Sequence, residues 1–245
     1  MVLIWTLVKL SELNIWDGKT MDGLLLVNKP VGITSFDVIR RLRRSIAPAT
    51  AKIGHAGTLD PLAGGLMLML FGSACKQAGQ FSKLDKTYQA KITLGADSST
   101  GDAEGELTAV GSRQPAAEEV EQTLLTFTGQ ITQTPSVYSA IKINGQEAYK
   151  LARRGQTPEV PSRTVTVYSL RMTGYNYPIL TIEADVSSGT YIRSLAQDIG
   201  QQLSTGAYLS GLVRTKVGEY QLEQATNLDE ASVEAIEGAL ITTAA

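Results

Sequence analysis

The sequence predicts an α+β domain, and three observations favour that class. Apolar runs typical of strands are interspersed with amphipathic stretches typical of helices, without the regular strand–helix–strand repeat of a parallel α/β sheet. Neither G-x-G-x-x-G nor G-x4-G-K-S/T opens a predicted helix, which disfavours a dinucleotide-binding or P-loop fold. Hydrophobic residues make up 43% of the 245 residues, which is enough to form a core.

The first predicted elements are a strand and a helix. Residues 24–28 are a short apolar run that Lys29 and Pro30 end, as expected of a strand. A helix should follow, because Thr34 is a favourable N-cap and Asp37 stands at the capping-box spacing. Its apolar stripe comprises Phe36, Val38, Ile39, Leu42 and Ile46. Four arginines fall largely on the other face of this helix: Arg40, Arg41, Arg43 and Arg44. This face is equally compatible with exposure to solvent and with contact to phosphates.

Residues 48–65 lack periodicity and are rich in glycine, which predicts a loop. A buried strand is expected at 66–71 and a short helix at 73–81. Residues 87–95 alternate as a strand does, with one face formed by Tyr88, Ala90, Ile92 and Leu94. The polar run 97–105 superficially resembles a calcium loop, but its oxygen side chains and glycine are misplaced for EF-hand spacing, so a surface turn is expected.

The second half predicts three helices, three strands and a helical tail. A helix is expected at 116–127 and a second at 146–154, where Gly155 ends it. The stretch between them at 130–144 is expected to be irregular. Strands at 164–172 and 180–186 flank a turn at 174–178, and Ser188 or Thr190 should cap a helix to residue 203. Residues 207–217 have strand character, and 228–240 predict one amphipathic helix.

Composition excludes several classes of site. A single cysteine, Cys75, rules out an internal disulfide framework, and a single histidine, His55, rules out a metal site built from several histidines. We therefore expect no metal and no cofactor. No apolar stretch approaches the roughly 20 residues of a membrane-spanning helix. Residues 1–10 are apolar but lack a basic region before them and a cleavage site after them, so a cytoplasmic chain is expected.

The net charge of −2 is unevenly distributed. All 22 lysines and arginines precede Glu219, and six acidic residues follow from there, so residues 1–218 carry +4. This mild positive charge permits an RNA substrate without arguing strongly for one. Residues 142–171 hold a local excess of +4, and the candidates for contact with an RNA backbone are Lys142, Lys150, Arg153 and Arg154.

Asp60 is the candidate nucleophile. It lies between Leu59 and Pro61 in the glycine-rich segment, where proline fixes the chain and the glycines allow another backbone to approach. From the residues alone, an aspartate before proline is more often a turn or cap residue than a catalyst.

Several blocks of sequence follow one another in an order that is more specific than any one of them. The first two are LLLVNKPVGITSFDV from Leu24 and GHAGTLDPLAGG at residues 54–65. The others are KTYQA from Lys86 with LGADSSTGDAEG from Leu94, YSAIKINGQEAYKLARRG from Tyr138, GTYIRSLAQDIG from Gly189, and LVRTKVG from Leu212. Together they resemble the TruB family of tRNA pseudouridine synthases over about residues 21–222.

The resemblance implies a pseudouridine synthase fold, with a mixed, mostly antiparallel central sheet flanked by helices and loops. It divides the chain into an N-terminal extension at 1–20, a catalytic domain at 21–222 and an acidic C-terminal helix at 223–245. The PUA-type domain usual in the bacterial family is expected to be missing from this sequence. Departures from the family pattern occur at Asn28, Phe36, Ala56, Val213 and residues 134–136, and Phe36 stands where histidine or asparagine is common.

The resemblance also implies an activity and its residues. Uridine 55 in the T loop of tRNA is isomerised to pseudouridine by base flipping, without a metal, with Asp60 as nucleophile and Arg193 as its ion-pair partner. Arg193 lies near the start of a predicted helix, where a cation opposes the helix dipole unless it has an anionic partner. Tyr88 matches the active-site tyrosine, His55 a histidine that contacts RNA near the flipped nucleotide, and Tyr191 and Leu212 residues that line the pocket. Lys29 is interpreted as a structural support.

The expected partner is tRNA, bound at its T loop by a monomer that needs no protein partner and no membrane. Two alternatives remain open. The chain could be a T-loop-binding or tRNA-folding factor that has lost turnover, or it could modify another target together with a guide RNA in a ribonucleoprotein.

Overall fold

The structure, a computed structural model, describes residues 21–46, 52–138, 141–143, 145–152, 154–156 and 158–243. In this part of the chain ten strands form one sheet, in the order β14-β1-β3-β12-β4-β11-β10-β7, with β2 paired to β3 and β13 to β12. Their bounds are β1 Gly23–Lys29, β2 Ile53–Ala56, β3 Ala63–Phe71, β4 Lys86–Leu94, β7 Gly129–Gln133, β10 Arg163–Asn176, β11 Ile179–Val186, β12 Ala207–Val217, β13 Tyr220–Gln221 and β14 Thr226–Asn227.

The remaining elements are short hairpins and helices. The hairpins pair β5 (Ala96–Ser98) with β6 (Leu107–Ala109), and β8 (Lys142–Ile143) with β9 (Gln146–Glu147). The α-helices are α1 Ser35–Ser45, α2 Ala78–Ser82, α3 Ala117–Thr126, α4 Ala148–Ala152, α5 Ile192–Gln202 and α6 Val233–Ala239. The 3-10 helices are η2 Gly72–Gln77, η3 Leu222–Gln224 and η4 Leu228–Glu230.

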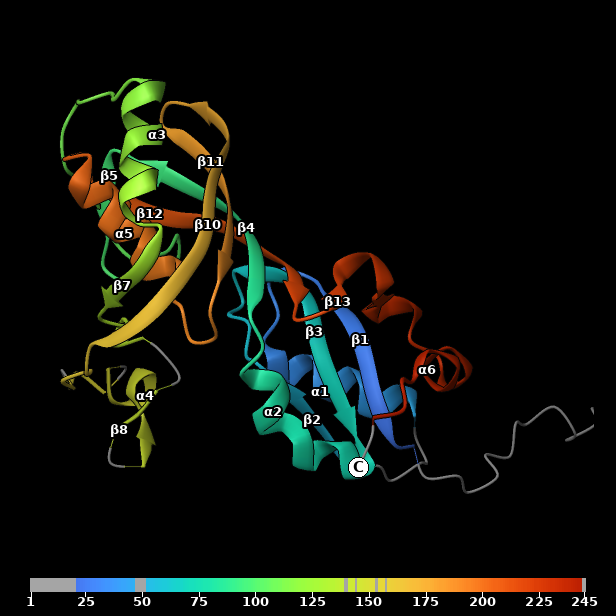
Figure 1. The fold of residues 1–245 in the computed structure, drawn as a ribbon. Coiled ribbons are helices and arrows are strands. Elements are labelled where there is room, and N and C mark those ends of the chain that lie inside the picture. The colour runs from blue at the N-terminus through green and yellow to red at the C-terminus, as the bar shows by residue number, and fades with distance from the viewer. Residues whose placement is uncertain are drawn as a thin grey trace, which may run out of the picture.

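The predicted mixed, mostly antiparallel sheet is confirmed. Strand β12 pairs in parallel with β3, and β14 with β1, while the other named pairs of the sheet are antiparallel. Figure 1 shows β4 and β12 running between two lobes, one with α3 and α5 and the other with α1, α2 and α6. The β8–β9 hairpin and α4 lie below β7, on the same side as the first lobe.

The core lies on both faces of β3. All nine residues of this strand are buried, and alternate side chains enter opposite clusters. Met67 and Met69 belong to the larger cluster, whereas Leu66 and Leu68 belong to the smaller one. The predicted alternation of β4 is also present, because the four residues of its predicted apolar face, Tyr88, Ala90, Ile92 and Leu94, are all buried in the larger cluster.

Helix α1 begins as the sequence predicts but buries a narrower face. Thr34 and Asp37 form the expected capping box. Val38, Ile39 and Leu42 enter the core, whereas Phe36 is 58% exposed, so its assignment to the apolar stripe is wrong. The reason is geometric, since consecutive residues lie about 100° apart around a helix and Phe36 directly follows Ser35, which is on the buried face.

The loop predicted at 48–65 is partly sheet. Strand β2 occupies residues 53–56, and β3 begins at Ala63 rather than at residue 66. Gly65 lies in a strand rather than in a loop, and its missing side chain lets β12 approach β3 closely. A Cβ on Gly65 would collide with the backbone of Arg214 on β12. Residues 130–133, the start of the stretch predicted to be irregular, belong to β7, which pairs with β10 at the edge of the sheet.

Two helix predictions also differ from the structure. Helix α5 has Tyr191 as its N-cap with no side-chain cap, instead of Ser188 or Thr190. The side chain of Gln133 partners the N-cap residue instead, because its Oε1 accepts from the Tyr191 N–H at 3.0 Å. The helix expected at 146–154 is shorter, since residues 146–147 belong to β9.

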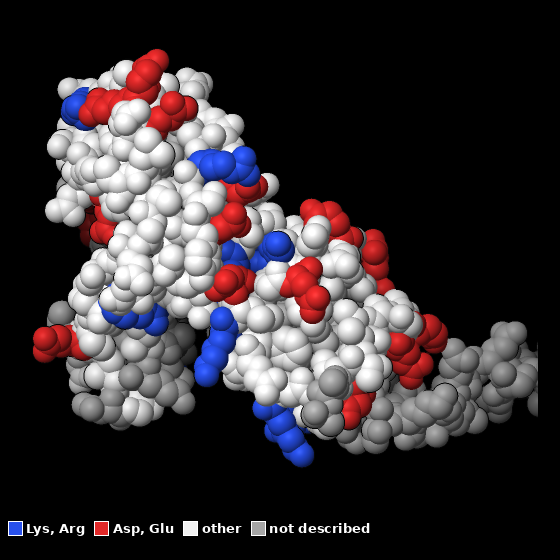
Figure 2. Space-filling view, in the orientation of Figure 1, with Lys and Arg blue, Asp and Glu red and all other residues white. Residues whose placement is uncertain are grey.

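The C-terminal segment packs against the edge of β1. Strand β14 pairs with β1, and the backbones of Ile241 and Leu24 exchange two hydrogen bonds of 2.8 and 2.9 Å. Residues 228–240 are not one helix but η4 and α6, because Leu228 and Ala231 enter the core and Ser232 then caps α6. Figure 2 shows acidic side chains over these elements and over α3.

Candidate active site

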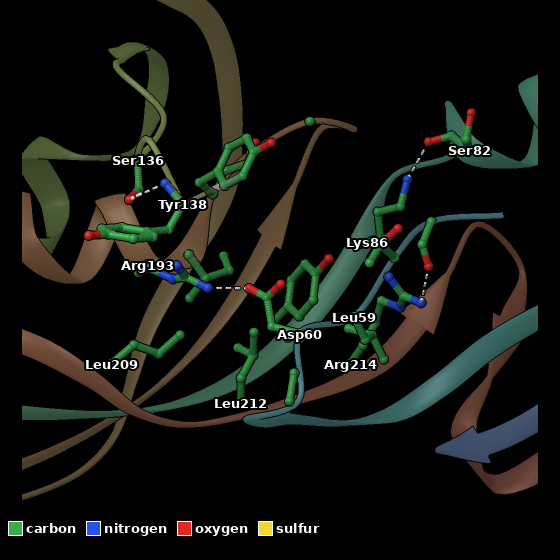
Figure 3. Close-up of a pocket in the computed structure, with 18 residues that line it drawn as sticks. Leu59, Asp60, Ser82, Lys86, Ser136, Tyr138, Arg193, Leu209, Leu212 and Arg214 are labelled. Carbon is green, nitrogen blue, oxygen red and sulfur yellow. Dashed lines mark hydrogen bonds and ion pairs between the residues drawn. The ribbon is translucent and has the colours of Figure 1, made fainter. Parts of the chain in front are cut away.

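Two cavities meet at Asp60. One, of about 280 Å³, is lined by Tyr88, Tyr191, Leu212 and Arg214 among others. The second, of about 550 Å³, is lined by His55 and residues of α1. Five residues line both cavities and form the boundary between them: Thr58, Leu59, Asp60, Tyr138 and Arg193. Figure 3 shows the Asp60 carboxylate in the middle of the first cavity, pointing toward Arg193.

The segment that carries Asp60 is fixed by hydrogen bonds to α1 and its preceding turn. The Ser35 hydroxyl donates to the Leu59 carbonyl and accepts from the Leu59 N–H, both at 2.9 Å. The Gly32 N–H donates to the Pro61 carbonyl at 2.8 Å, and the Ala63 N–H donates to the Asp60 carbonyl at 3.0 Å. The backbone is therefore held on both sides of a side chain that remains 55% exposed.

Ser35→Ala tests this support. We expect the variant to lose about 1–3 kcal/mol of unfolding free energy, because the buried N–H and C=O of Leu59 lose their partner. Urea unfolding measures the loss, and the reaction rate at saturating substrate should fall with it. Ser45→Ala is the matched control, since its hydroxyl bonds only the carbonyl of Arg41 in the same helix. Equal stability of the two variants would contradict this role for Ser35.

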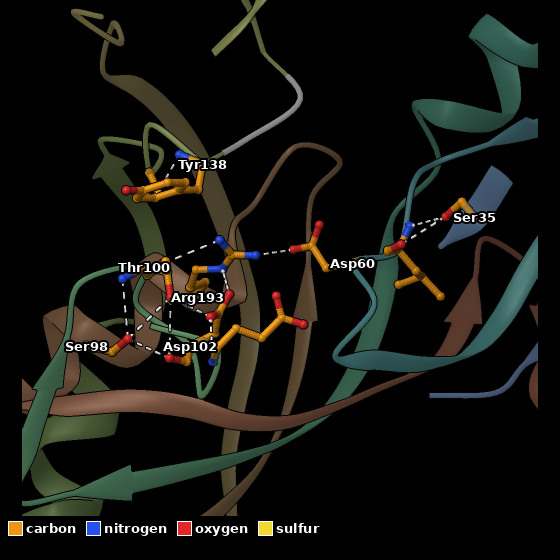
Figure 4. Close-up of polar contacts among 10 residues, drawn as sticks. Ser35, Asp60, Ser98, Thr100, Asp102, Tyr138 and Arg193 are labelled. Atoms are coloured by element: carbon orange, nitrogen blue, oxygen red, sulfur yellow. Dashed lines mark hydrogen bonds and ion pairs between the residues drawn. The ribbon is translucent and has the colours of Figure 1, made fainter. Parts of the chain in front are cut away.

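Arg193 lies between two carboxylates (Figure 4). Its Nη2 donates to Asp60 Oδ2, its Nε lies 3.0 Å from Asp102 Oδ2, and its Nη1 donates to the Thr100 carbonyl at 3.4 Å. The Arg193 and Asp102 side chains are only 10% and 5% exposed. Arg193 is the second residue of α5, so the two carboxylates supply the anionic partners that a cation near a helix N-terminus requires.

Asp102 is the site residue that the sequence analysis missed. The expected surface turn at 97–105 buries Asp102, whose Oδ1 accepts from Thr100 Oγ1 at 2.6 Å and from the Glu104 N–H at 3.1 Å. Gly101 permits this approach, because its φ is +78° and a Cβ there would lie 2.7 Å from Gln197 Oε1. The available signal was the mostly polar run with glycines at 101 and 105, which specifies a tight turn but not its partner.

Two buried cations, Lys29 and Arg214, hold backbone carbonyls of the turn before α1 and of the residues on either side of the Asp60 segment. Lys29 Nζ donates to the carbonyls of Ile33 and Pro30 at 2.7 and 3.0 Å. Arg214 donates from Nε to the Leu66 carbonyl at 2.8 Å and from Nη2 to the Gly57 carbonyl at 3.1 Å. Burial lowers the pKa of Lys29 to about 8; the Asp60 charge opposes that shift and the Arg214 charge adds to it.

This shift predicts a pH dependence of stability. Between pH 8 and the ordinary lysine pKa of 10.5, the unfolded chain binds a proton at Lys29 that the folded chain does not. The free energy of unfolding should therefore rise with pH in that window. Lys86, whose pKa burial also lowers to about 8, adds to the rise. We expect Lys29→Met to reduce the slope in urea unfolding between pH 8 and 9.5, and an unchanged slope would contradict the shift.

The structure places the other predicted pocket residues around the first cavity. Tyr88 is a buried residue of β4, and Leu212 lies on β12, where it is in register with Ala90 of β4 and Ala63 of β3. Tyr191 precedes α5, and the Arg163 guanidinium lies 4.6 Å from the centre of its ring. Arg163 also donates to the Gly189 carbonyl, so it fixes the segment that leads to Tyr191.

His55 lies in the second cavity rather than in the first. It is a residue of β2, in register with Met69 of β3, and its buried Nδ1 has no hydrogen-bond partner among the described residues. Burial lowers the pKa of His55, and the positive charge of Arg214 lowers it further. The imidazole is therefore neutral at pH 7 and offers a flat ring rather than a charge.

Of the basic candidates, Arg153 lies outside the described residues. Lys142 is in β8, Lys150 is in α4 and Arg154 follows α4, and none of the three lines either cavity that meets at Asp60. Among the described residues, no three His, Cys, Asp or Glu side chains are grouped as metal ligands would be. None of the described helices has the length and apolar composition needed to cross a membrane.

Comparison with known proteins gives consistent matches. Residues 43–192 match the family model of the TruB family pseudouridylate synthase N-terminal domain. The chain is 44% identical over 214 residues to tRNA pseudouridine synthase B of Burkholderia lata, covering 87% of this chain and 66% of that protein. It is 46% identical over 203 residues to tRNA pseudouridine synthase B of Fusobacterium nucleatum, covering 83% and 70%.

Solved structures give the same fold. A Cbf5–Nop10–Gar1 complex contains a chain with a TM-score of 0.67 and 26% identity, covering 84% of this chain and 52% of that one. A chain of an H/ACA ribonucleoprotein bound to a substrate RNA containing 2′-deoxyuridine has a TM-score of 0.63 and 24% identity, covering 84% and 51%. The chain thus spans about two thirds of the length of its curated relatives and about half that of these solved chains.

Proposed function

The chain belongs to the TruB family of pseudouridylate synthases, and from this premise we propose that it isomerises uridine 55 in the T loop of tRNA to pseudouridine. The observation that carries the proposal is the Asp60–Arg193 ion pair at the junction of the two cavities. A half-exposed carboxylate whose backbone is fixed and whose charge is paired is suited to nucleophilic attack on a bound nucleotide. The names of the curated relatives support the substrate.

The reaction breaks the bond between N1 of uracil and C1′ of the sugar, and forms a bond between C5 and C1′. Asp60 attacks the nucleotide and forms a covalent adduct while the base turns, and the adduct then breaks and frees the Asp60 carboxylate, so that no bond to the enzyme remains in the product. The C5 proton then leaves and N1 is protonated, so the product is an isomer of the substrate. Arg193 holds the Asp60 carboxylate toward the cavity and is itself oriented by Asp102.

The detached uracil must stay in the site until the new bond forms. Tyr88, Tyr191 and Leu212 line the cavity of about 280 Å³ beside Asp60, and we assign to them the retention of the base. Tyr88 offers a ring face for stacking and a hydroxyl for the late proton transfer from C5. The guanidinium of Arg163 against the Tyr191 ring keeps that wall of the cavity in place.

The target nucleotide must leave the loop to reach Asp60, which costs a few kcal/mol. To His55, which lines the second cavity, we assign the role of filling the gap that the extruded base leaves. We propose that the chain acts as a monomer without a protein partner, and in the cytoplasm, where this substrate is available. Residues 21–222 would form the catalytic unit, with the later segment serving as a cover for the edge of β1.

The product position tests the proposal. An unmodified tRNA transcript is incubated with excess purified chain, and pseudouridine is located by carbodiimide modification and primer extension. We expect a single stop at position 55, and none in a transcript with cytidine at that position. Tight tRNA binding without product would favour the binding or folding factor. Product that forms only after a guide RNA and further proteins are added would favour the ribonucleoprotein alternative.

A further inference from the structure

The second cavity contains an aromatic side chain that the proposed mechanism does not use. Phe36, in the first turn of α1, lines this cavity together with His55 and Pro61. Its side chain is 58% exposed, although it is large and apolar. A single exposed apolar residue needs no explanation on an ordinary surface, but this one lines a cavity that ends at Asp60.

The same face of α1 carries positive charge away from the cavity. Arg40 and Arg43 are four and seven residues after Phe36, so the three side chains share one helix face, and both arginines are exposed. The Arg40 guanidinium carbon lies 6.0 Å from the centre of the Phe36 ring, and Arg40 also pairs with Asp37. An aromatic ring followed by arginines is the arrangement that binds an unpaired nucleotide and its backbone.

We propose that Phe36 is a stacking platform for an unpaired base that neighbours the flipped uridine, with Arg40 and Arg43 contacting the following phosphates. This inference rests on the proposed function and names a further specificity-determining residue of the same site. The base, not the phosphate, enters the cavity, because Glu104, which also lines it, is an exposed carboxylate that repels phosphate. The Asp60–Arg193 pair separates the two nucleotides, the target in the first cavity and its neighbour in the second.

Stacking on Phe36 would keep the nucleotide next to the target in an extended position. Ring faces tolerate any base, so this contact selects an unstacked loop rather than a sequence. The contact is made equally before and during the reaction. Its loss should therefore weaken RNA binding more than it lowers the reaction rate of the bound complex.

The test compares Phe36→Ala with Phe36→Trp, using a T-stem-loop RNA. The control is Leu125→Ala, because Leu125 is a 61% exposed apolar residue on α3, in the other lobe. We expect Phe36→Ala to weaken RNA affinity by about ten-fold while the single-turnover rate at saturating enzyme is kept. Phe36→Trp should bind as well as the wild type, and Leu125→Ala should bind unchanged.

A fluorescent reporter tests stacking directly. The RNA carries 2-aminopurine on the 5′ or the 3′ side of the target, and fluorescence is read in an Asp60→Asn background so that the RNA is not converted. Quenching on one side that is lost in Phe36→Ala and kept in Phe36→Trp is the expected result.

Three results would overturn the inference: wild-type affinity in Phe36→Ala, an equal loss in Phe36→Trp, or an equal loss in Leu125→Ala. If the wild type makes no pseudouridine at all, the proposed function fails instead, and the fluorescence still reports whether Phe36 stacks on a base.

Discussion

Asp60→Asn is expected to abolish uridine isomerisation, with a loss of about 10⁴-fold or more in the single-turnover rate, because the covalent adduct cannot form. The amide keeps the size of the carboxylate, and Ser35 and Ala63 still fix the backbone around it, so folding and tRNA binding should be retained. Nuclease digestion and chromatography of the RNA measure the rate, and filter binding measures the affinity.

The matched control for Asp60→Asn is Asp229→Asn. Asp229 also pairs with an arginine, at 3.0 Å from Arg41, but it is 84% exposed and lines neither cavity that meets at Asp60. This variant should react at the wild-type rate. A residual rate in Asp60→Asn within ten-fold of the wild type would remove Asp60 as the nucleophile.

Arg193→Met is expected to reduce both stability and rate. Removing the guanidinium leaves Asp102 buried without its ion-pair partner, which costs about 3–5 kcal/mol of unfolding free energy. It also releases the Asp60 carboxylate from the orientation that Figure 3 shows. Urea unfolding and single-turnover kinetics measure the two effects.

A double variant separates the two effects of Arg193. In Arg193→Met/Asp102→Asn no carboxylate is left buried and unpaired, so most of the lost stability should return. The isomerisation rate should stay low, because Asp60 still lacks its partner. Recovery of both stability and rate would mean that Arg193 serves the fold alone and does not orient Asp60.

Local patterns predicted the elements that hold the site. The alternation of β4 placed Tyr88 on a buried face, and the Thr34–Asp37 capping box located the start of α1, whose first residue Ser35 holds Leu59. These features depend on residues a few positions apart, where propensity and periodicity act. The resemblance carried by the ordered sequence blocks supplied the reactive residues, and Asp60 and Arg193 do form an ion pair in the structure.

Features that depend on distant partners were not predictable. Nothing near Asp102 reveals that it lies against Arg193, which is 91 residues further along the chain. The glycines at 64 and 65 look like a loop until β12 is placed beside them. Phe36 fits an apolar stripe by spacing, yet the neighbouring elements of the fold cover a narrower face of α1. In each case tertiary packing decided between two locally reasonable structures.

Release of tritium from C5 of uridine tests the central claim most directly, because C5 becomes the glycosidic carbon and must lose its hydrogen. A tRNA transcript labelled at C5 of its uridines is incubated with the wild type, with Asp60→Asn and with Asp229→Asn. We predict release equivalent to one uridine per tRNA from the wild type and from Asp229→Asn, and no release from Asp60→Asn. Equal release from Asp60→Asn, or no release from a wild type that binds the tRNA, would contradict the account.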